Sequence, residues 1–252
     1  MGKITILDAT PKKPFELMGF MAGECWGSDT STDEKNKKRG MSCVADGHGR
    51  VWELADVYMK IEGYSARVMR EWYTHIGCLP TRLQASTRYI NYDNLEVIKP
   101  DLIRVNDEAN KEYDKCVEQI RQSYKALVDM GIKKEDVANL LPLGMTTVVM
   151  DKRNARNLIE MSHQRLCGRA YWEYRRLIKD IMNALSQYSD EWNFIVDTYM
   201  KPKCDVLGYC TEKHGCGRKP YRKVDCVDRT IGWNFDTNQT VVNFNEFTKK
   251  KN

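Results

Sequence analysis

The sequence predicts a mixed α/β protein, because helix-like and strand-like patterns alternate along its 252 residues. Two long segments, residues 106–131 and 154–185, repeat apolar side chains at steps of three and four, which is the spacing of one helix face. Two shorter segments, residues 3–7 and 139–150, alternate in polarity or are rich in β-branched residues, as strands are. A chain of this length can bury a sizeable core.

The N-terminal part is expected to form a strand at residues 3–7 and then a helix that begins near Phe15. Pro14 fits this start, since proline is tolerated in the first helical turn. Residues 28–47 are polar and charged, so they predict an exposed loop.

Residues 51–61 mix β-branched, aromatic and apolar side chains, which favours a helical turn leading into a strand that Gly63 ends. Ser65 is then in position to cap a helix over residues 66–76. Gly77 is expected to stop that helix.

The second half predicts three further elements. Asn106 begins a long amphipathic helix that ends at Gly131. Residues 139–150 predict a strand or a buried extended segment. A helical pattern then covers residues 154–185, with Gly168 as a point where it bends or stops.

Composition and charge limit the classes of function. Forty basic and thirty-five acidic residues give a net charge of +5, spread along the chain, which suits a phosphate-bearing small substrate better than nucleic acid. No apolar run reaches the roughly 18 residues that a membrane helix needs, and the N-terminus lacks the pattern of a secretory signal. We therefore expect a cytoplasmic protein with no membrane partner.

We expect one main domain over residues 1–200, followed by a Cys-rich extension over residues 201–252 that does not fold independently. Nine cysteines in a chain without a secretory signal indicate reduced thiols or metal ligands rather than disulfides. In the extension, a tetrahedral zinc site is one reading, and unpaired buried thiols or a redox role are the alternatives. Its candidate ligands are Cys204, Cys210, Cys216 and either His214 or Cys226.

The stretch Pro80 to Tyr89, PTRLQASTRY, gathers the groups that a nucleoside monophosphate requires. Arg88 with Ser86 and Thr87 can bind a phosphate dianion, and the amide of Gln84 can read a base edge. The alternative is a surface loop whose arginines are merely solvated. Spacing alone leaves both open.

At this point the sequence resembles the flavin-dependent thymidylate synthases. Four landmarks of that family occur in the same order, from a Gly-His sequence to a closing Ala-x-x-Glu. The matching residues are Gly47, His48, Gly49 and Glu53; Trp72, Tyr73 and His75 with Ser86, Arg88 and Tyr89; Leu141 and Pro142 with Asn154, Arg156 and Arg165; and Ala170 with Glu173.

The resemblance implies a curved antiparallel sheet flanked by helices, in a homotetramer whose flavin sites lie between chains. It also implies synthesis of dTMP from dUMP, with methylenetetrahydrofolate as one-carbon donor, reduced FAD as hydride donor and NADPH as the reductant of the flavin. No cysteine nucleophile is needed, so we expect none of the thiols to be essential for the methylation step.

The resemblance also implies a role for each matched residue. The residues expected to contact FAD are His48, Arg50, His75, Asn154 and Arg156. The residues expected to bind dUMP are Glu71, Gln84, Ser86, Thr87, Arg88 and Arg165. Of these, Ser86 and Arg165 are the candidate catalytic residues, with Arg165 coming from a neighbouring subunit and stabilising charge on the pyrimidine.

The sequence departs from the family pattern at several positions. The arginines of the family's Arg-His-Arg triplet are Thr74 and Ile76 here, and the segment that follows is about two residues longer. Arg82 lies in this extension, and our hypothesis is that it restores one lost flavin contact. Further departures fall on Ala138 and Glu160.

Two other functions compete with this interpretation. One is an enzyme of the same fold that modifies another pyrimidine nucleotide, for example by hydroxymethylation. The other is a non-catalytic nucleic-acid-binding protein that uses the basic residues and the Cys-rich extension.

Overall fold

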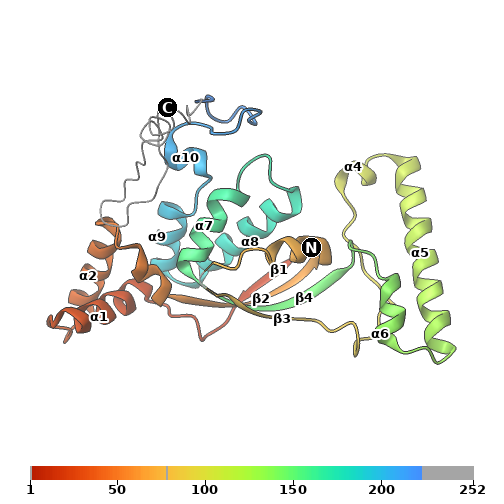
Figure 1. Ribbon diagram of the computed structural model, residues 1–252, viewed down its shortest axis with the longest axis horizontal. Coiled ribbons are helices and arrows are strands. Elements are labelled where there is room, and N and C mark those ends of the chain that lie inside the picture. Colours follow the sequence, from red (N-terminus) through yellow and green to blue (C-terminus); the bar gives the residue numbers. More distant parts are fainter. Residues whose placement is uncertain (1, 78, 223–252) are drawn as a thin grey trace, which may run out of the picture. The chain divides into compact units, whose positions relative to one another are not determined.

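The computed structural model describes residues 2–77 and 79–222, and it confirms the mixed α/β class (Figure 1). The described chain forms two compact units, each built from separate parts of the sequence. The first unit comprises the described parts of Met1–Thr5, Met59–Ile76 and Thr81–Asp151. The second comprises those of Ile6–Tyr58, Gly77–Pro80 and Lys152–Asn252. The extension predicted for residues 201–252 stays a prediction, and its residues 223–252 lie outside the described part.

A four-stranded antiparallel sheet has the order β1-β2-β4-β3, so the last strand of the sequence lies between β2 and β3. The strands are β1 (Lys3–Ile6), β2 (Asp56–Ser65), β3 (Thr81–Gln84) and β4 (Thr146–Asn154). The expected end of β2 at Gly63 was wrong. Gly63 adopts a positive φ of 68°, which glycine tolerates, and the strand continues to Ser65.

Helices α1 (Pro14–Trp26) and α2 (Asp33–Ala45) lie side by side in the second unit (Figure 1). The loop predicted for residues 28–47 was therefore wrong over most of its length. The two helices meet through glycines: a Cβ on Gly19 would lie 1.8 Å from the Asn36 carbonyl oxygen, and one on Gly40 would lie 2.1 Å from that of Phe15. Helix α2 therefore packs on α1 through its backbone at these glycines. The polar side chains of α2 give no sign of this contact.

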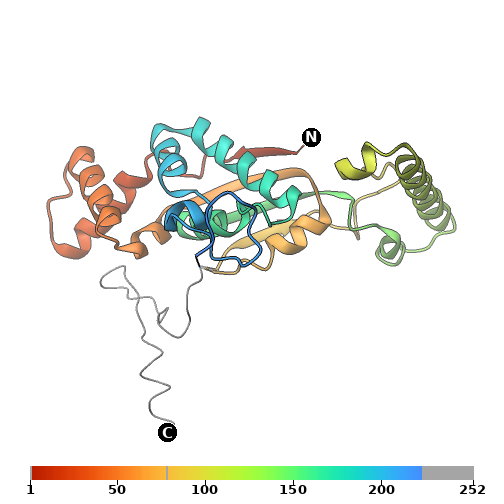
Figure 2. The same ribbon diagram turned by 90° about the horizontal axis from the view of Figure 1, so that it is seen from above.

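The first unit contains α3 (Ala66–Trp72) and, farther along, the long helix α5 (Asp107–Asp129). The predicted caps are confirmed, because Ser65 Oγ accepts from the Val68 N–H and Asn106 Oδ1 accepts from the Ala109 N–H. Figure 2 shows α5 beside its short neighbours. These are α4 (Asp101–Arg104), α6 (Lys134–Val137) and the 3-10 turn η2 (Ala138–Leu140).

The helical pattern of residues 154–185 is split in two around Gly168, as predicted. Helix α7 (Ala155–Arg165) ends before it and α8 (Trp172–Tyr188) begins after it. Helices α9 (Asp190–Tyr199) and α10 (Lys203–Leu207) follow, and α10 packs against α7. Of the five residues predicted on one buried face, the four on α8 are at most 1% exposed: Tyr174, Leu177, Ile181 and Leu185. The fifth, Ala170, precedes α8 and is half-buried. None of the described helices combines the length and the apolar character that a bilayer span requires.

Candidate functional site

The predicted site residues divide between the two compact units, and each group is described within its own unit. The group in the first unit is Glu71, His75, Arg82, Gln84, Ser86, Thr87 and Arg88. The group in the second unit is His48, Arg50, Asn154, Arg156 and Arg165.

In the first unit, the end of α3 and the start of β3 are joined by a stacked pair. The Arg82 guanidinium lies 4.3 Å from the centroid of the Tyr73 ring. Tyr73 stands between Glu71 and His75 in the sequence. This contact therefore holds the segment that carries those two predicted site residues against β3. Burial raises the pKa of the Tyr73 hydroxyl, while the charge of Arg82 opposes that shift.

Arg82 has an unsatisfied hydrogen-bond donor. Its Nη1 atom is buried, yet it has no hydrogen-bond partner among the described residues. A buried charged donor without a partner is costly, so the position favours an acceptor oxygen from outside the chain. Sequence reasoning named Arg82 but missed its stacking partner Tyr73.

The predicted phosphate-binding residues follow β3 directly. The Gln84 amide donates to Thr147 Oγ1 at 3.4 Å on β4. The Arg88 backbone N–H donates to Ser86 Oγ at 3.2 Å, which forms a tight turn and fixes the Ser86 hydroxyl beside Thr87. The predicted phosphate-binding residues therefore lie on one short turn that directly follows β3.

The Arg88 side chain is engaged by an acidic residue that the sequence did not reveal. Its Nε donates to Glu135 Oε2 at 2.8 Å, and the two side chains are 62% and 41% exposed. Glu135 lies on α6, 47 residues later in the chain. No spacing rule connects residues so far apart, so only the fold could identify this pair.

In the second unit, Arg156 links two segments that are far apart in the sequence. Its Nη1 lies 2.6 Å from Glu53 Oε1, and its Nε lies 3.1 Å from Glu160 Oε1. Burial works against the Arg156 charge, but the bonds to both carboxylates outweigh it and raise the pKa of the guanidinium. The pair with Glu160 has the i,i+4 spacing that the sequence could have revealed.

The Glu53 end of this link belongs to the 3-10 turn η1 (Gly49–Leu54), which packs on α7 and carries the predicted Arg50. His48 precedes the turn and contacts the Trp26 ring edge-on, at 6.2 Å between centroids. Both His48 and Arg50 are exposed. The structure thus brings the Gly-His segment to the first turn of α7.

Asn154 caps α7 and is 5% exposed. Its Oδ1 accepts from the Asn157 N–H at 3.0 Å. The Asn154 side chain therefore caps the start of α7. This cap stabilises the first helical turn, which carries Arg156.

Arg165 stands at the opposite end of α7. Arg165 follows Arg156 by nine helical residues, a rise of roughly 14 Å, so one chain holds the two side chains at opposite ends of the helix. The Arg165 guanidinium lies 4.6 Å from the centroid of the Tyr174 ring. The neighbouring His163 hydrogen-bonds the Tyr199 carbonyl at 3.2 Å.

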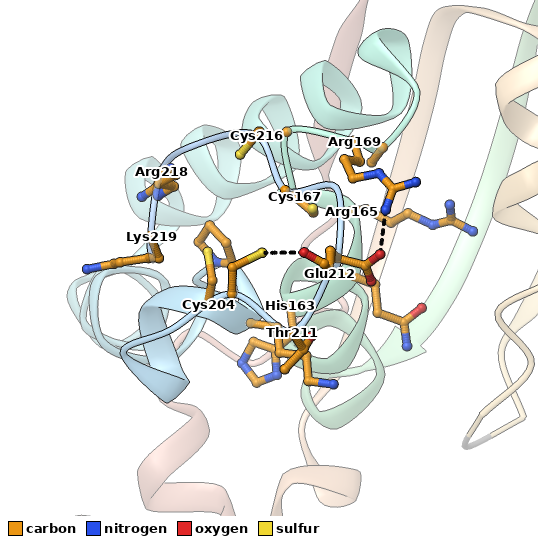
Figure 3. Close-up of a pocket in the computed structure, with 17 residues that line it drawn as sticks. His163, Arg165, Cys167, Arg169, Cys204, Thr211, Glu212, Cys216, Arg218 and Lys219 are labelled. Atoms are coloured by element: carbon orange, nitrogen blue, oxygen red, sulfur yellow. Dashed lines mark hydrogen bonds and ion pairs between the residues drawn. The ribbon is translucent and has the colours of Figure 1, made fainter. Parts of the chain in front are cut away.

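A pocket of about 460 Å³ opens between the end of α7 and residues 202–219, and Arg165 lines it (Figure 3). Three of the predicted zinc ligands, Cys204, Cys210 and Cys216, also line this pocket, whereas His214 does not. Among the described residues, no three His, Cys, Asp or Glu side chains converge with metal-ligand spacing. The alternative ligand Cys226 lies outside the described residues.

Comparison with known proteins matches the family model described as thymidylate synthase complementing protein, Thy1, over residues 5–189. Among similar curated proteins, the flavin-dependent thymidylate synthase of Pyrococcus furiosus is 26% identical over 242 residues, covering 90% of this chain and 98% of the relative. That of Geobacter sulfurreducens is 28% identical over 190 residues, covering 71% and 80%.

Among solved structures, flavin-dependent thymidylate synthase from Helicobacter pylori, complexed with FAD and dUMP, superposes with a TM-score of 0.62. The match covers 79% of this chain and 100% of that chain, at 18% identity, and it confirms the expected fold. The family model covers most of the chain and ends before the extension. The chain therefore belongs to the Thy1 family, the family of the flavin-dependent thymidylate synthases.

Proposed function

We propose that this chain is a flavin-dependent thymidylate synthase that makes dTMP from dUMP, with methylenetetrahydrofolate as the one-carbon donor. The proposal rests on the residues at the end of β3 and in the turn that follows it. Gln84 on β3 and the Ser86 to Arg88 turn directly after it place an amide, two hydroxyl groups and a cation on one short segment. That set matches the needs of a uridine monophosphate.

The phosphate of dUMP fits the Ser86 to Arg88 turn. Arg88 is largely exposed and is held by a single carboxylate, and an exposed ion pair contributes only about 0–1 kcal/mol. A phosphate dianion can replace that carboxylate with stronger charge-assisted hydrogen bonds. Ser86 accepts from a backbone N–H, so its hydroxyl proton is available to the substrate.

The residues also fit a flavin. Nη1 of Arg82 is a buried donor without a partner, which suits an oxygen of the isoalloxazine or of the FAD phosphates. Arg156 is aligned at the first turn of α7 by its ion pairs with Glu53 and Glu160. FAD, when bound, supplies the hydride, and NADPH is the proposed source of its electrons.

Arg165 serves a different step. In our proposal its guanidinium stabilises negative charge on a uracil carbonyl oxygen, and it does so in the site of a neighbouring subunit. Arg165 and Arg156 lie at opposite ends of α7, so one chain presents its flavin-contacting and its pyrimidine-contacting arginine at two separate places, which supports this assignment. A homotetramer, a cytoplasmic location and a zinc site in the extension belong to the same proposal.

Two measurements test the function. The freshly purified protein should be yellow, with a flavin absorbance spectrum. Incubation of labelled dUMP with NADPH, FAD and methylenetetrahydrofolate should then give a product with the mass of dTMP. A colourless protein that makes no dTMP would refute the proposal.

The replaced Arg-His-Arg triplet favours keeping one second candidate, an enzyme that hydroxymethylates a pyrimidine nucleotide. Thr74 and Ile76 remove two cations from the end of α3 and so change the groups near the one-carbon unit. The same incubation separates the two activities by product mass. A nucleic-acid-binding protein would instead be colourless and would lose affinity steeply with salt.

A further inference from the structure

A second pocket of the second unit, of about 380 Å³, lies between the end of α1 and the surface of α2. Its aromatic member is Trp26, the last residue of α1, which is 58% exposed. The other lining residues are Lys35, Lys38, Arg39, Ser42, Cys43 and Asp46. None of these side chains belongs to the flavin and dUMP groups described above.

The three cations of this pocket share one face of α2. Lys35, Lys38 and Arg39 are spaced at i, i+3 and i+4, so their side chains project from the same side of the helix. Gly40, through which α2 packs on α1, follows Lys38 by two residues and therefore lies on the other side. The cations thus form an ordered row beside the exposed indole.

The cations differ in how firmly they are held. Arg39 is fixed, because it donates to the carbonyl oxygens of Gly19 and Asp29 at 2.9 and 2.7 Å. Lys35 forms an ion pair with the Asp29 carboxylate in which both side chains are 55% exposed, and such pairs exchange readily for a stronger anion. Lys38 is exposed and forms no ion pair with another residue that the structure describes. Two lysines are therefore available to an anionic ligand.

Trp26 also connects this pocket to the predicted flavin site. Its ring meets the His48 ring edge-on, at 6.2 Å between centroids. His48 directly precedes η1, on which both α1 and α2 pack (Figure 1). Because His48 is expected to contact FAD, the pocket adjoins the place where the flavin is expected to bind.

The chemistry of the pocket suits an adenine nucleotide with an additional phosphate. An exposed aromatic ring is a platform on which a base can stack. A lysine binds phosphate as a point charge. Asp46, the acidic member of the lining, is engaged by the Ser42 hydroxyl, which donates to Asp46 Oδ2 at 3.1 Å. The pocket volume lies near the lower end of the range for ligand sites, about 300–1,000 Å³, so it suits one half of a dinucleotide.

We propose that this pocket binds the 2′-phosphoadenosine half of NADPH. Trp26 stacks on the adenine, and Lys35 and Lys38 bind the 2′-phosphate. The inference rests on the proposed function, in which NADPH gives a hydride to FAD and leaves as NADP⁺. The contact between Trp26 and His48 places the bound NADPH next to the flavin that it reduces.

A binding experiment tests the pocket without catalysis. Flavin-loaded full-length protein is titrated calorimetrically with adenosine 2′,5′-bisphosphate and with adenosine 5′-monophosphate. The bisphosphate should bind about tenfold more tightly, because only it carries the 2′-phosphate. Trp26→Ala should weaken the binding of both nucleotides by about tenfold, because both stack. Lys38→Ala should weaken the bisphosphate alone.

A kinetic experiment separates this site from the proposed function. Trp26→Ala and Lys38→Ala should raise the KM for NADPH and leave the KM for dUMP unchanged. With dithionite in place of NADPH as the reductant, both variants should make dTMP at the wild-type rate. Wild-type protein that makes no dTMP with dithionite would refute the proposed function, while the nucleotide titration would still test the pocket.

Two matched controls lie outside the pocket lining. Phe20→Ala removes another exposed aromatic ring of α1, and Lys179→Ala removes an exposed lysine of α8; neither should change the affinity for the bisphosphate. Circular dichroism checks that each variant is folded. Three results would each overturn the proposal: wild-type protein that does not bind the bisphosphate, an unchanged affinity in Lys38→Ala, or a Trp26→Ala variant that loses FAD and keeps its affinity for the bisphosphate.

Discussion

Glu135→Gln is expected to tighten the binding of dUMP, because Glu135 competes with the phosphate for Arg88. The Arg88 to Glu135 pair is short, at 2.8 Å, but its side chains are 62% and 41% exposed, so solvent screens it strongly. Such pairs contribute about 0–1 kcal/mol. Removing the competitor should therefore lower the Kd of dUMP by up to about fivefold.

The assay is calorimetric titration of flavin-loaded protein with dUMP at low and high salt. The gain should shrink as salt rises, because screening weakens the pair that the substitution removes. Glu112→Gln is the matched control: Glu112 forms an exposed pair with Lys115 on α5, away from the β3 segment, and its loss should leave the Kd unchanged. A weaker affinity in Glu135→Gln would refute the competition between Glu135 and the phosphate.

Three further outcomes follow from the site. Arg82→Ala should reduce flavin occupancy, and Arg82→Lys should restore it only in part, because lysine keeps the charge but not the planar stack on Tyr73; full occupancy in both would reject a flavin role. Asn154→Ala should lower the free energy of unfolding by about 1 kcal/mol in urea titrations, because it removes the cap of α7, whereas Asn154→Ser should recover most of the loss. Burial lowers the pKa of His163 below its value in the unfolded chain, so the unfolded state binds more protons and stability falls as pH drops from about 6.5 toward the folded pKa. His163→Gln should flatten that dependence, and an equal pH slope in both proteins would contradict it.

The elements that the sequence predicted well are those whose signals are local. Ser65 and Asn106 begin helices because their own side chains accept from N–H groups three residues later. The apolar face of α8 was readable because its repeat matches the helical period. Helix α2 was missed because its core contact is a glycine-to-glycine approach, and glycine gives no hydrophobic signal.

By itself, the sequence determined the fold class, the family and the short segment from Gln84 to Arg88, since these depend on periodicity and on motifs of neighbouring residues. Only the tertiary structure decided which charges oppose the arginines of the site. Glu135 meets Arg88 across 47 residues and Glu53 meets Arg156 across 103. Pairing at such separations is set by how strands and helices pack, because electrostatic contact depends on distance in space and not on position in the chain.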